Sequence, residues 1–224
     1  MLFNSVSYFL NPKKSNIVTI GIDLYQQNVC ISLRSSANEN GIRIPDWGMF
    51  EARFGEIEDY FAFPEENRKL EFIIEDADAF ETTHFCGRTR HGKKYIKLQA
   101  MQVTRANNLY LCKDSFMQLK LLRKLIACKR IELLPSVQTV KSIFDIMSSA
   151  ISKHKIVTDA IFDDIFVKQI QNMDVDQIIQ ENEMNLSQVT ILYEILYFRP
   201  GALALMHNWK QLIEKHEEDC KCYA

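Results

Sequence analysis

Short segments rich in β-branched residues alternate with polar turns in the first part of the chain, which predicts β-structure. Residues 17–25 (IVTIGIDLY) and 28–35 (NVCISLRS) have the length and composition of strands, with a two-residue turn between them. Residues 41–45 (GIRIP) are too few for anything but a third strand. Asp46 then precedes apolar side chains that recur every three or four positions, so we expect a helix capped by Asp46.

A second stretch of the chain repeats this plan. Its expected strands are residues 69–80, 81–90, 93–103 and 108–113. A turn is expected at His91-Gly92, and Asp114 or Ser115 can cap the helix that follows the last strand. The expected buried face of this helix consists of Phe116, Leu119, Leu122 and Ile126. Because the two stretches share one order of strands and helix, we interpret them as an internal repeat.

After Pro135 the apolar spacing becomes helical throughout. The predicted fold is therefore α+β: two antiparallel four-stranded-sheet-plus-helix repeats that form a pseudo-dimer, followed by an all-helical C-terminal module. The predicted boundaries are 1–63 for the first sheet-plus-helix half, 64–134 for the second, basic half, and 135–224 for the helical module.

Charge is segregated along the chain, although the formal net charge is only −2. Between Thr82 and Ile131, Asp114 is the only acid among many lysines and arginines, whereas the flanking segments are acidic. A field of one sign over a region of this size indicates an anionic partner. The alternative is a solvated charged face that binds nothing.

Candidate binding residues follow from the alternation of side chains along a strand. Arg88 and Arg90 are expected to share one face of a sheet, and Tyr95 and Lys97 join them if the strands align. Cations and an aromatic ring on one face can contact phosphates and stack on bases at the same time.

Aromatic side chains near these cations are candidate stacking platforms. Tyr95 is the favoured one. For Phe85 and Tyr110 the sequence does not decide between the face that the helix covers and the face that meets water. Lys93 and Lys94 at the hairpin tip, with Arg105 beyond the next turn, are expected to contact phosphates. Arg34 and Arg43 are the corresponding candidates in the first half. The complete candidate set for nucleic-acid binding is Arg34, Arg43, Phe85, Arg88, Arg90, Lys93, Lys94, Tyr95, Lys97, Arg105 and Tyr110.

Four short motifs carry a resemblance to a known family. ISLR (31–34) and GIRI (41–44) precede the first expected helix, and YIKL (95–98) and NLYL (108–111) precede the second. With the helices that follow, they resemble the single-stranded-DNA-binding domain of the transcriptional positive cofactor four family, in two divergent tandem copies with an unrelated helical C-terminal region. The resemblance spans roughly residues 5–131.

That resemblance implies a curved four-stranded antiparallel sheet followed by one helix, a dimeric arrangement, and binding without catalysis. The chain departs from the family pattern in several ways, one of which is that the first copy is net acidic. The first helix carries its aromatic residue one position late, and the Lys/Arg-rich loop before the Gly-Ile strand is absent from both copies. The first half is therefore expected to contact the ligand less than the second.

Other chemistry is weakly represented, so we expect no enzyme activity, cofactor or metal. The chain has no Gly-rich phosphate-binding loop. The cysteines lack the spacing of a disulfide framework and are expected to be free thiols. A weaker candidate zinc site consists of His207, His216, Cys220 and Cys222. Another weak candidate is a metal site formed by the carboxylates of Glu71, Glu75, Asp76 and Asp78, which lack the defined spacing of a metal-dependent nuclease.

No apolar run of about 18 residues occurs, so no membrane span is expected. The start of the chain lacks the charge order of a signal peptide, which favours an intracellular protein, nuclear in a eukaryote or a virus that replicates in the nucleus. The many Asn, Ile, Lys and Phe residues favour a viral or mobile-element genome. The expected function is non-catalytic single-stranded DNA binding in replication, transcription or repair. The alternatives are RNA binding, or a scaffold role in which residues 135–224 recruit a protein partner or another copy.

Overall fold

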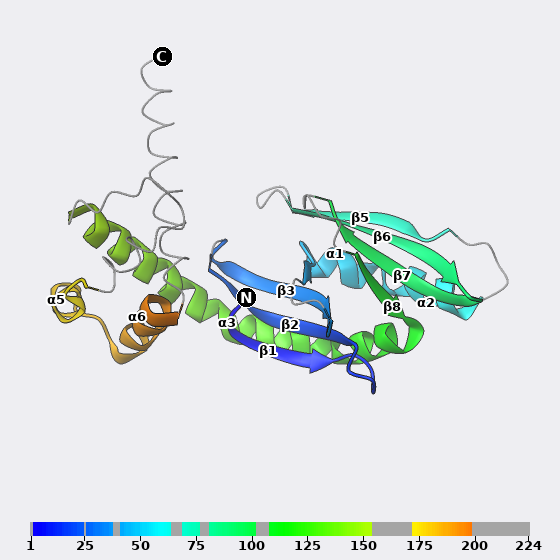
Figure 1. Cartoon of the computed structure of the whole chain (residues 1–224), viewed down its shortest axis with the longest axis horizontal. Helices are drawn as coiled ribbons and strands as arrows, with labels where there is room; N and C mark the ends of the chain where they lie inside the picture. Colours follow the sequence, from blue (N-terminus) through cyan, green and yellow to red (C-terminus); the bar gives the residue numbers. More distant parts are fainter. Residues whose placement is uncertain are drawn as a thin grey trace, which may run out of the picture. The chain divides into compact units, whose positions relative to one another are not determined.

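The computed structural model describes residues 2–24, 26–37, 41–63, 69–76, 81–101, 108–153 and 172–198. Within them the fold is α+β, with two four-stranded antiparallel sheets and a long helix (Figure 1). The first sheet consists of β1 (Phe3–Phe9), β2 (Asn16–Asp23), β3 (Asn28–Ser35) and β4 (Ile42–Arg43), in that order. The second sheet consists of β5 (Glu71–Asp76), β6 (Glu81–Arg90), β7 (Lys93–Ala100) and β8 (Asn108–Cys112), also in sequence order.

Each sheet is followed by helical structure. The short helices after the first sheet are α1 (Trp47–Ala52) and α2 (Phe54–Ala62). Asp46 caps α1 as predicted, because its carboxylate accepts a hydrogen bond of 2.9 Å from the Met49 backbone N–H. The helix expected to be continuous here is divided at Arg53. The long helix after the second sheet is α3 (Lys113–Lys153), and further along the chain lie α5 (Val175–Glu181) and α6 (Leu186–Phe198).

The helices that follow the first sheet in sequence pack on the second sheet. Phe50 of α1 stacks on Phe85 of β6 with ring centroids 5.0 Å apart, and Phe85 in turn stacks on Phe72 of β5 at 4.7 Å. Tyr60 of α2 lies against Gly87 of β6. Burial of these rings supplies much of the apolar contact between helix and sheet.

The beginning of α3 is attached to the first sheet. Ser115 is fully buried, and its hydroxyl accepts hydrogen bonds from the side-chain amides of Asn11 at 2.9 Å and Asn16 at 3.1 Å. Figure 1 shows α3 continuing behind β1 to β3. Phe116 also contacts the rings of Phe54 and Phe61, so α2 and α3 share one aromatic core.

Two compact units divide the chain, residues 1–134 and 135–224. The division falls inside α3, which includes Pro135. The change of sequence pattern at Pro135 suggests a break between helices, but the structure has one continuous helix there. A proline inside a helix lacks the N–H donor, and its ring crowds the carbonyl four residues earlier, so the burial of neighbours such as Leu133 and Val137 has to offset that cost.

The close contact between Tyr60 and Gly87 gives a test of this packing. A Cβ atom at residue 87 would lie 2.7 Å from Tyr60 Cε2 and Cζ, so Gly87→Ala forces the ring or the strand to move. We expect a loss of about 1–3 kcal/mol in the free energy of unfolding, measured by urea denaturation. Gly55→Ala is the matched control, because a Cβ there meets nothing within 4 Å and α2 gains a better helix former. Equal stability of the two variants would contradict the packing of α2 on β6.

Candidate nucleic-acid interface

Cross-strand pairing sorts the side chains of the second sheet onto two faces. Phe72, Phe85, Leu98 and Leu109 are paired across the four strands, and all four are buried. This is the covered face, on which α1 and α2 pack. Residues at the alternate positions therefore lie on the opposite side, which we call the open face.

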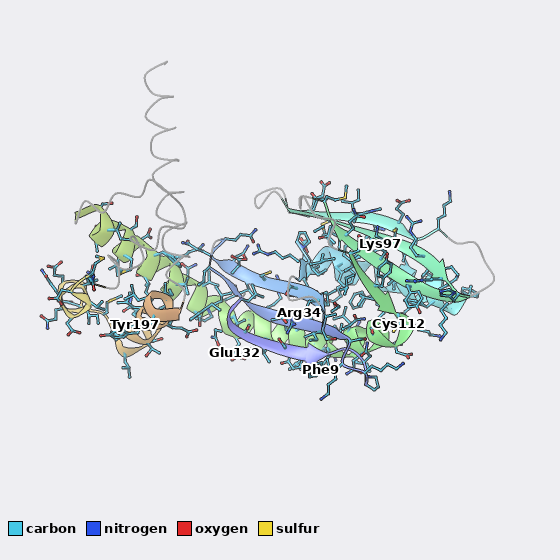
Figure 2. The ribbon with its side chains drawn as sticks, viewed as in Figure 1. Phe9, Arg34, Lys97, Cys112, Glu132 and Tyr197 are labelled. Carbon is cyan, nitrogen blue, oxygen red and sulfur yellow. The ribbon has the colours of Figure 1, made fainter. Side chains whose placement is uncertain are left out.

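The open face carries the cations and rings of β6 to β8 in adjoining rows. Arg88 pairs with Tyr95, and one row away Lys97 pairs with Tyr110. Toward the hairpin, Arg90 pairs with Lys93. Arg88, Arg90 and Lys93 are exposed, and half of the Tyr110 surface is exposed. Lys97 is half-buried and donates a hydrogen bond of 2.8 Å to the Gln99 side-chain oxygen, which holds it along the face (Figure 2).

Two predicted binding residues lie on the covered face instead. Phe85 is completely buried between Phe50 and Phe72, so it cannot stack on a base, and that prediction is wrong. The Lys94 ammonium donates hydrogen bonds to the backbone carbonyls of Tyr60 at 2.9 Å and Phe63 at 2.6 Å. Lys94 therefore joins α2 to the sheet and does not share a surface with Lys93.

The Tyr60 hydroxyl supports the strand that presents Arg88. It donates a hydrogen bond of 3.1 Å to the Arg88 backbone carbonyl. Burial raises the pKa of Tyr60 above its usual 10.0, which favours the protonated, hydrogen-bond-donating form of the hydroxyl. The backbone of β6 is thereby fixed from the covered side while its arginine side chains stay in water.

Acidic side chains occupy the other end of the open face. Glu71 of β5 lies in the same row as Lys97, and its carboxylate is 3.0 Å from His84 Nε2. Glu75 is exposed four residues further along β5. An anion is therefore attracted to the β6–β7 hairpin side of the face and repelled from the β5 edge.

The first sheet presents fewer cations. The Arg43 guanidinium forms an ion pair with the buried carboxylate of Asp23, which leaves it less able to bind a phosphate. Arg34 is half-buried and pairs across Ile17 with Phe9. On the first sheet, therefore, Arg43 is engaged within the chain and Arg34 is partly covered.

Phe9 was not among the predicted binding residues. Its side chain is 50% exposed, and the Lys14 ammonium lies 5.2 Å from the ring centroid. Lys14, Phe9 and Arg34 thus bring two cations and a ring to one end of the first sheet. Figure 2 labels Phe9 and Arg34. In β1 the exposed Ser7 and Phe9 alternate with the half-buried Val6 and Tyr8, but β1 was not expected to be a strand.

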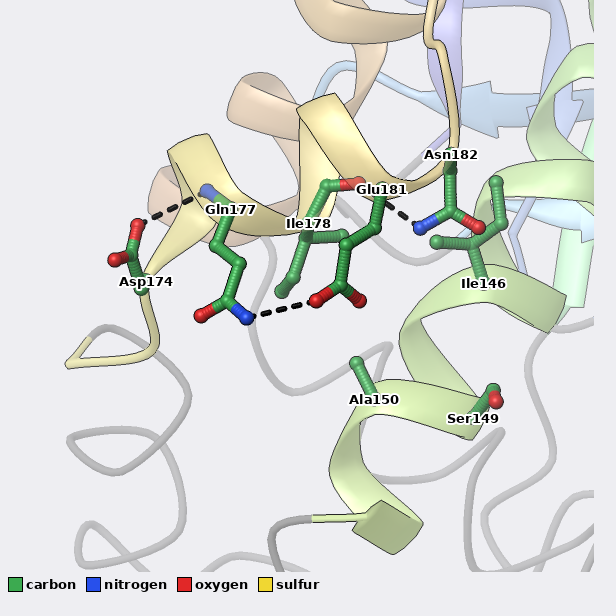
Figure 3. Close-up of a pocket in the computed structure, with 8 residues that line it drawn as sticks. All are labelled: Ile146, Ser149, Ala150, Asp174, Gln177, Ile178, Glu181 and Asn182. Carbon is green, nitrogen blue, oxygen red and sulfur yellow. Dashed lines mark hydrogen bonds between the residues drawn. The ribbon is translucent and has the colours of Figure 1, made fainter.

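A small hollow of about 210 Å³ lies in the unit formed by residues 135–224 (Figure 3). Its polar side chains bond one another: the Gln177 amide donates to Glu181 at 2.7 Å, and Asp174 caps the Gln177 backbone N–H at 3.0 Å. These bonds stabilise α5 and leave no convergent reactive set.

Two candidate sites fall outside the described residues: Arg105, and the four histidines and cysteines considered for zinc near the end of the chain. In the described ranges no three His, Cys, Asp or Glu side chains gather as metal ligands would. Nor does any described helix combine the length and hydropathy needed to cross a membrane.

Comparison of this chain with models of protein families, with curated proteins and with solved structures finds no match.

Proposed function

We propose that this protein binds single-stranded DNA, without catalysis, on the open face of its second sheet. One observation carries the proposal: Arg88, Tyr95, Lys97 and Tyr110 lie in adjoining rows on the face opposite α1 and α2. Base stacking on the two rings and ionic contacts to phosphates suit a strand whose bases are unpaired. A role in replication, transcription or repair follows from that activity.

The arrangement favours single strands over duplexes for a physical reason. Bases in a duplex are stacked on one another and present only their edges, whereas unpaired bases can place a π-face on Tyr95 or Tyr110. Each such stack is worth about 1–3 kcal/mol. The cations at the hairpin side, Arg88, Arg90 and Lys93, then follow the backbone without selecting a sequence.

The two halves of residues 1–134 form, in this proposal, a covalent pseudo-dimer like the dimers of the positive cofactor four family. Each half has four antiparallel strands followed by helical structure. Support comes from the exchange of helices, since α1 and α2 pack on the second sheet while Ser115 of α3 is bonded to the first. Such reciprocal packing is expected of two halves that replace two subunits.

The test is binding of fluorescent oligothymidine, single-stranded or paired with oligoadenine, over a series of salt concentrations. We expect a strong preference for the single strand. With about four cations engaged, the logarithm of affinity should fall with the logarithm of salt with a slope near −3. Equal affinity for single strand and duplex would contradict the stacking part of the proposal. Undetectable binding at low salt would refute it and favour a scaffold role. Tighter binding of oligouridine would assign RNA as the ligand.

A further inference from the structure

Lys97 and Gln99 lie two residues apart on β7, so their side chains share the open face of the second sheet. Gln99 pairs across the strands with Asn108 of β8, one row beyond the pair formed by Lys97 and Tyr110. The Lys97 ammonium donates a hydrogen bond of 2.8 Å to the Gln99 side-chain oxygen. This contact joins the two rows beside the exposed ring of Tyr110.

The chemistry of lysine fixes the orientation of the Gln99 amide. An ammonium group has three N–H donors and no acceptor, so only the oxygen of the amide can face it. The Gln99 side chain therefore keeps its NH2 group, which has donors only, for a ligand. The Lys97 ammonium also has N–H groups beyond the one that Gln99 accepts. Two neighbouring side chains thus present donors without an acceptor, although an isolated glutamine presents both.

The residues on either side of Gln99 in its row leave this donor pair unchanged. Asn108 is exposed opposite Gln99, and its amide can rotate to supply either a donor or an acceptor. His84 lies on the β6 side of Gln99 and is directed toward β5, where its Nε2 atom is 3.0 Å from the Glu71 carboxylate. Neither neighbour therefore places a fixed acceptor beside the Gln99 NH2 group.

Two carboxylates share the open face but lie at its β5 edge. Glu71 is in the row of Lys97 and Glu75 is one row beyond Gln99, and β6 separates both from β7. Two strand spacings place the backbone of β5 about 10 Å from that of β7. A base that stacks on a ring of β8 lies one spacing further away, so it meets the donors of β7 before it meets a carboxylate.

Tyr110 places a stacked base within reach of the donor pair. It is directly opposite Lys97 and diagonal to Gln99. Diagonal neighbours on one face of an antiparallel pair are about 7 Å apart, and direct neighbours are closer. The edge of a base that lies on the Tyr110 ring is therefore beside the Lys97 ammonium and the Gln99 NH2 group.

A pair of donors selects bases that present two adjacent acceptors. Guanine has O6 beside N7, and cytosine has O2 beside N3. Adenine instead places an amino donor beside N1 and N7, and thymine places the N3–H donor between O2 and O4. Donation to guanine O6 and N7 is the commonest base-specific contact in protein–DNA complexes. The edges of unpaired bases, including the O2 and N3 edge of cytosine, are open to the same kind of contact.

We propose that Lys97 and Gln99 select a guanine or a cytosine at the position that stacks on Tyr110. The inference rests on the proposed binding of single-stranded DNA and adds recognition of one base to it. Lys97 donates to one acceptor of the base and the Gln99 NH2 group donates to the other. Contacts to phosphates elsewhere on the open face remain independent of sequence.

The probe is a short fluorescent oligothymidine in which one central base is replaced by guanine, cytosine or adenine. Anisotropy with the full chain should show that guanine or cytosine binds at least about fivefold tighter than thymine or adenine, the low end of the discrimination given by a bidentate base contact. An equal gain for adenine would reflect stacking alone and overturn the inference. No gain for any base would overturn it too, while binding of oligothymidine itself upholds the proposed function. If no oligonucleotide binds, both proposals fail.

Base analogues identify the edge that is recognised. A deaza analogue of guanine that lacks N7 should lose the gain, whereas inosine, which keeps O6 and N7 but lacks the exocyclic amino group, should retain it. Where cytosine gives the gain, the analogue that lacks N3 should lose it. A guanine gain that survives removal of N7 but not removal of the amino group would require an acceptor on the protein, against the proposal.

A single substitution then tests the role of Gln99. Gln99→Met removes the NH2 donors with little change of volume and no change of charge. We expect the affinity of the guanine or cytosine oligonucleotide, divided by that of unsubstituted oligothymidine, to fall to the ratio found for adenine. A general loss of folding or binding would lower both affinities together and leave this ratio unchanged.

The matched control is Gln118→Met, because Gln118 is a half-buried glutamine of the same unit that lies on α3 and not on the open face. This variant should keep the ratio of the wild type. If Gln99→Met and Gln118→Met both keep it, recognition of the base does not come from Gln99, and the inference is wrong.

Discussion

Reversal of three charges on the open face, with Arg88→Glu, Arg90→Glu and Lys97→Glu combined, is expected to lower the affinity for single-stranded oligothymidine about 100-fold or more at low salt. In the proposed complex, each substitution removes a phosphate contact and adds a repulsive carboxylate on the same face. The salt dependence should become shallower as well, by about 2 in slope, because three fewer counterions are released on binding.

The matched control reverses three cations elsewhere on the same unit. Arg123, Lys124 and Arg130 are exposed on α3, away from the strands that carry the open face, so their replacement by Glu changes the formal net charge by the same amount. This control should retain oligothymidine binding to within a few-fold, and circular dichroism should confirm that both variants are folded. Equal losses in the two variants would mean that net charge, and not the open face, attracts the nucleic acid.

Strand alternation made much of the open face predictable. Arg88 and Arg90 share a face because they are two residues apart, and the turn at His91-Gly92 then fixes Tyr95 opposite Arg88. The same alternation held an unused clue about Phe85 and Lys94. Phe85 is an odd number of positions from Arg88, so the two side chains lie on opposite faces of the sheet. Lys94 and Lys93 are adjacent in one strand, so they lie on opposite faces as well.

The residues on either side of Tyr110 in β8 indicate on which face of the sheet its ring lies. It lies between Leu109 and Leu111, both of which are buried, so the ring points to the open side. Attention to the two leucines would have settled its orientation from the sequence, because a half-buried strand places alternate apolar residues in the core.

Other features depend on contacts that local sequence does not encode. β1 was missed because a bulge between Phe3 and Val6, with Asn4 at φ 45°, interrupts the alternation of its side chains. The packing of α1 and α2 on the second sheet joins residues such as Phe50 and Phe85 that are far apart in sequence.

Phe85→Ala is expected to be the most damaging single substitution for stability. The side chain is completely buried and stacks on both Phe50 and Phe72, so its truncation leaves a cavity and removes two ring contacts. Large-to-small changes of this kind cost about 3–5 kcal/mol, which urea denaturation would record as a lower unfolding midpoint. At a temperature where the variant remains folded, its affinity for oligothymidine should be close to that of the wild type.

Tyr110→Ala should show the opposite behaviour, because half of that ring is in water and its row partner is Lys97. We expect little change in the unfolding midpoint and a loss of about 1–3 kcal/mol in binding free energy, the worth of one stacked base. The two aromatic residues thus separate support of the sheet from contact with the ligand. If Phe85→Ala abolished binding in a folded protein while Tyr110→Ala left it unchanged, the ligand would have to bind on the covered face, and the open face would lose its proposed role.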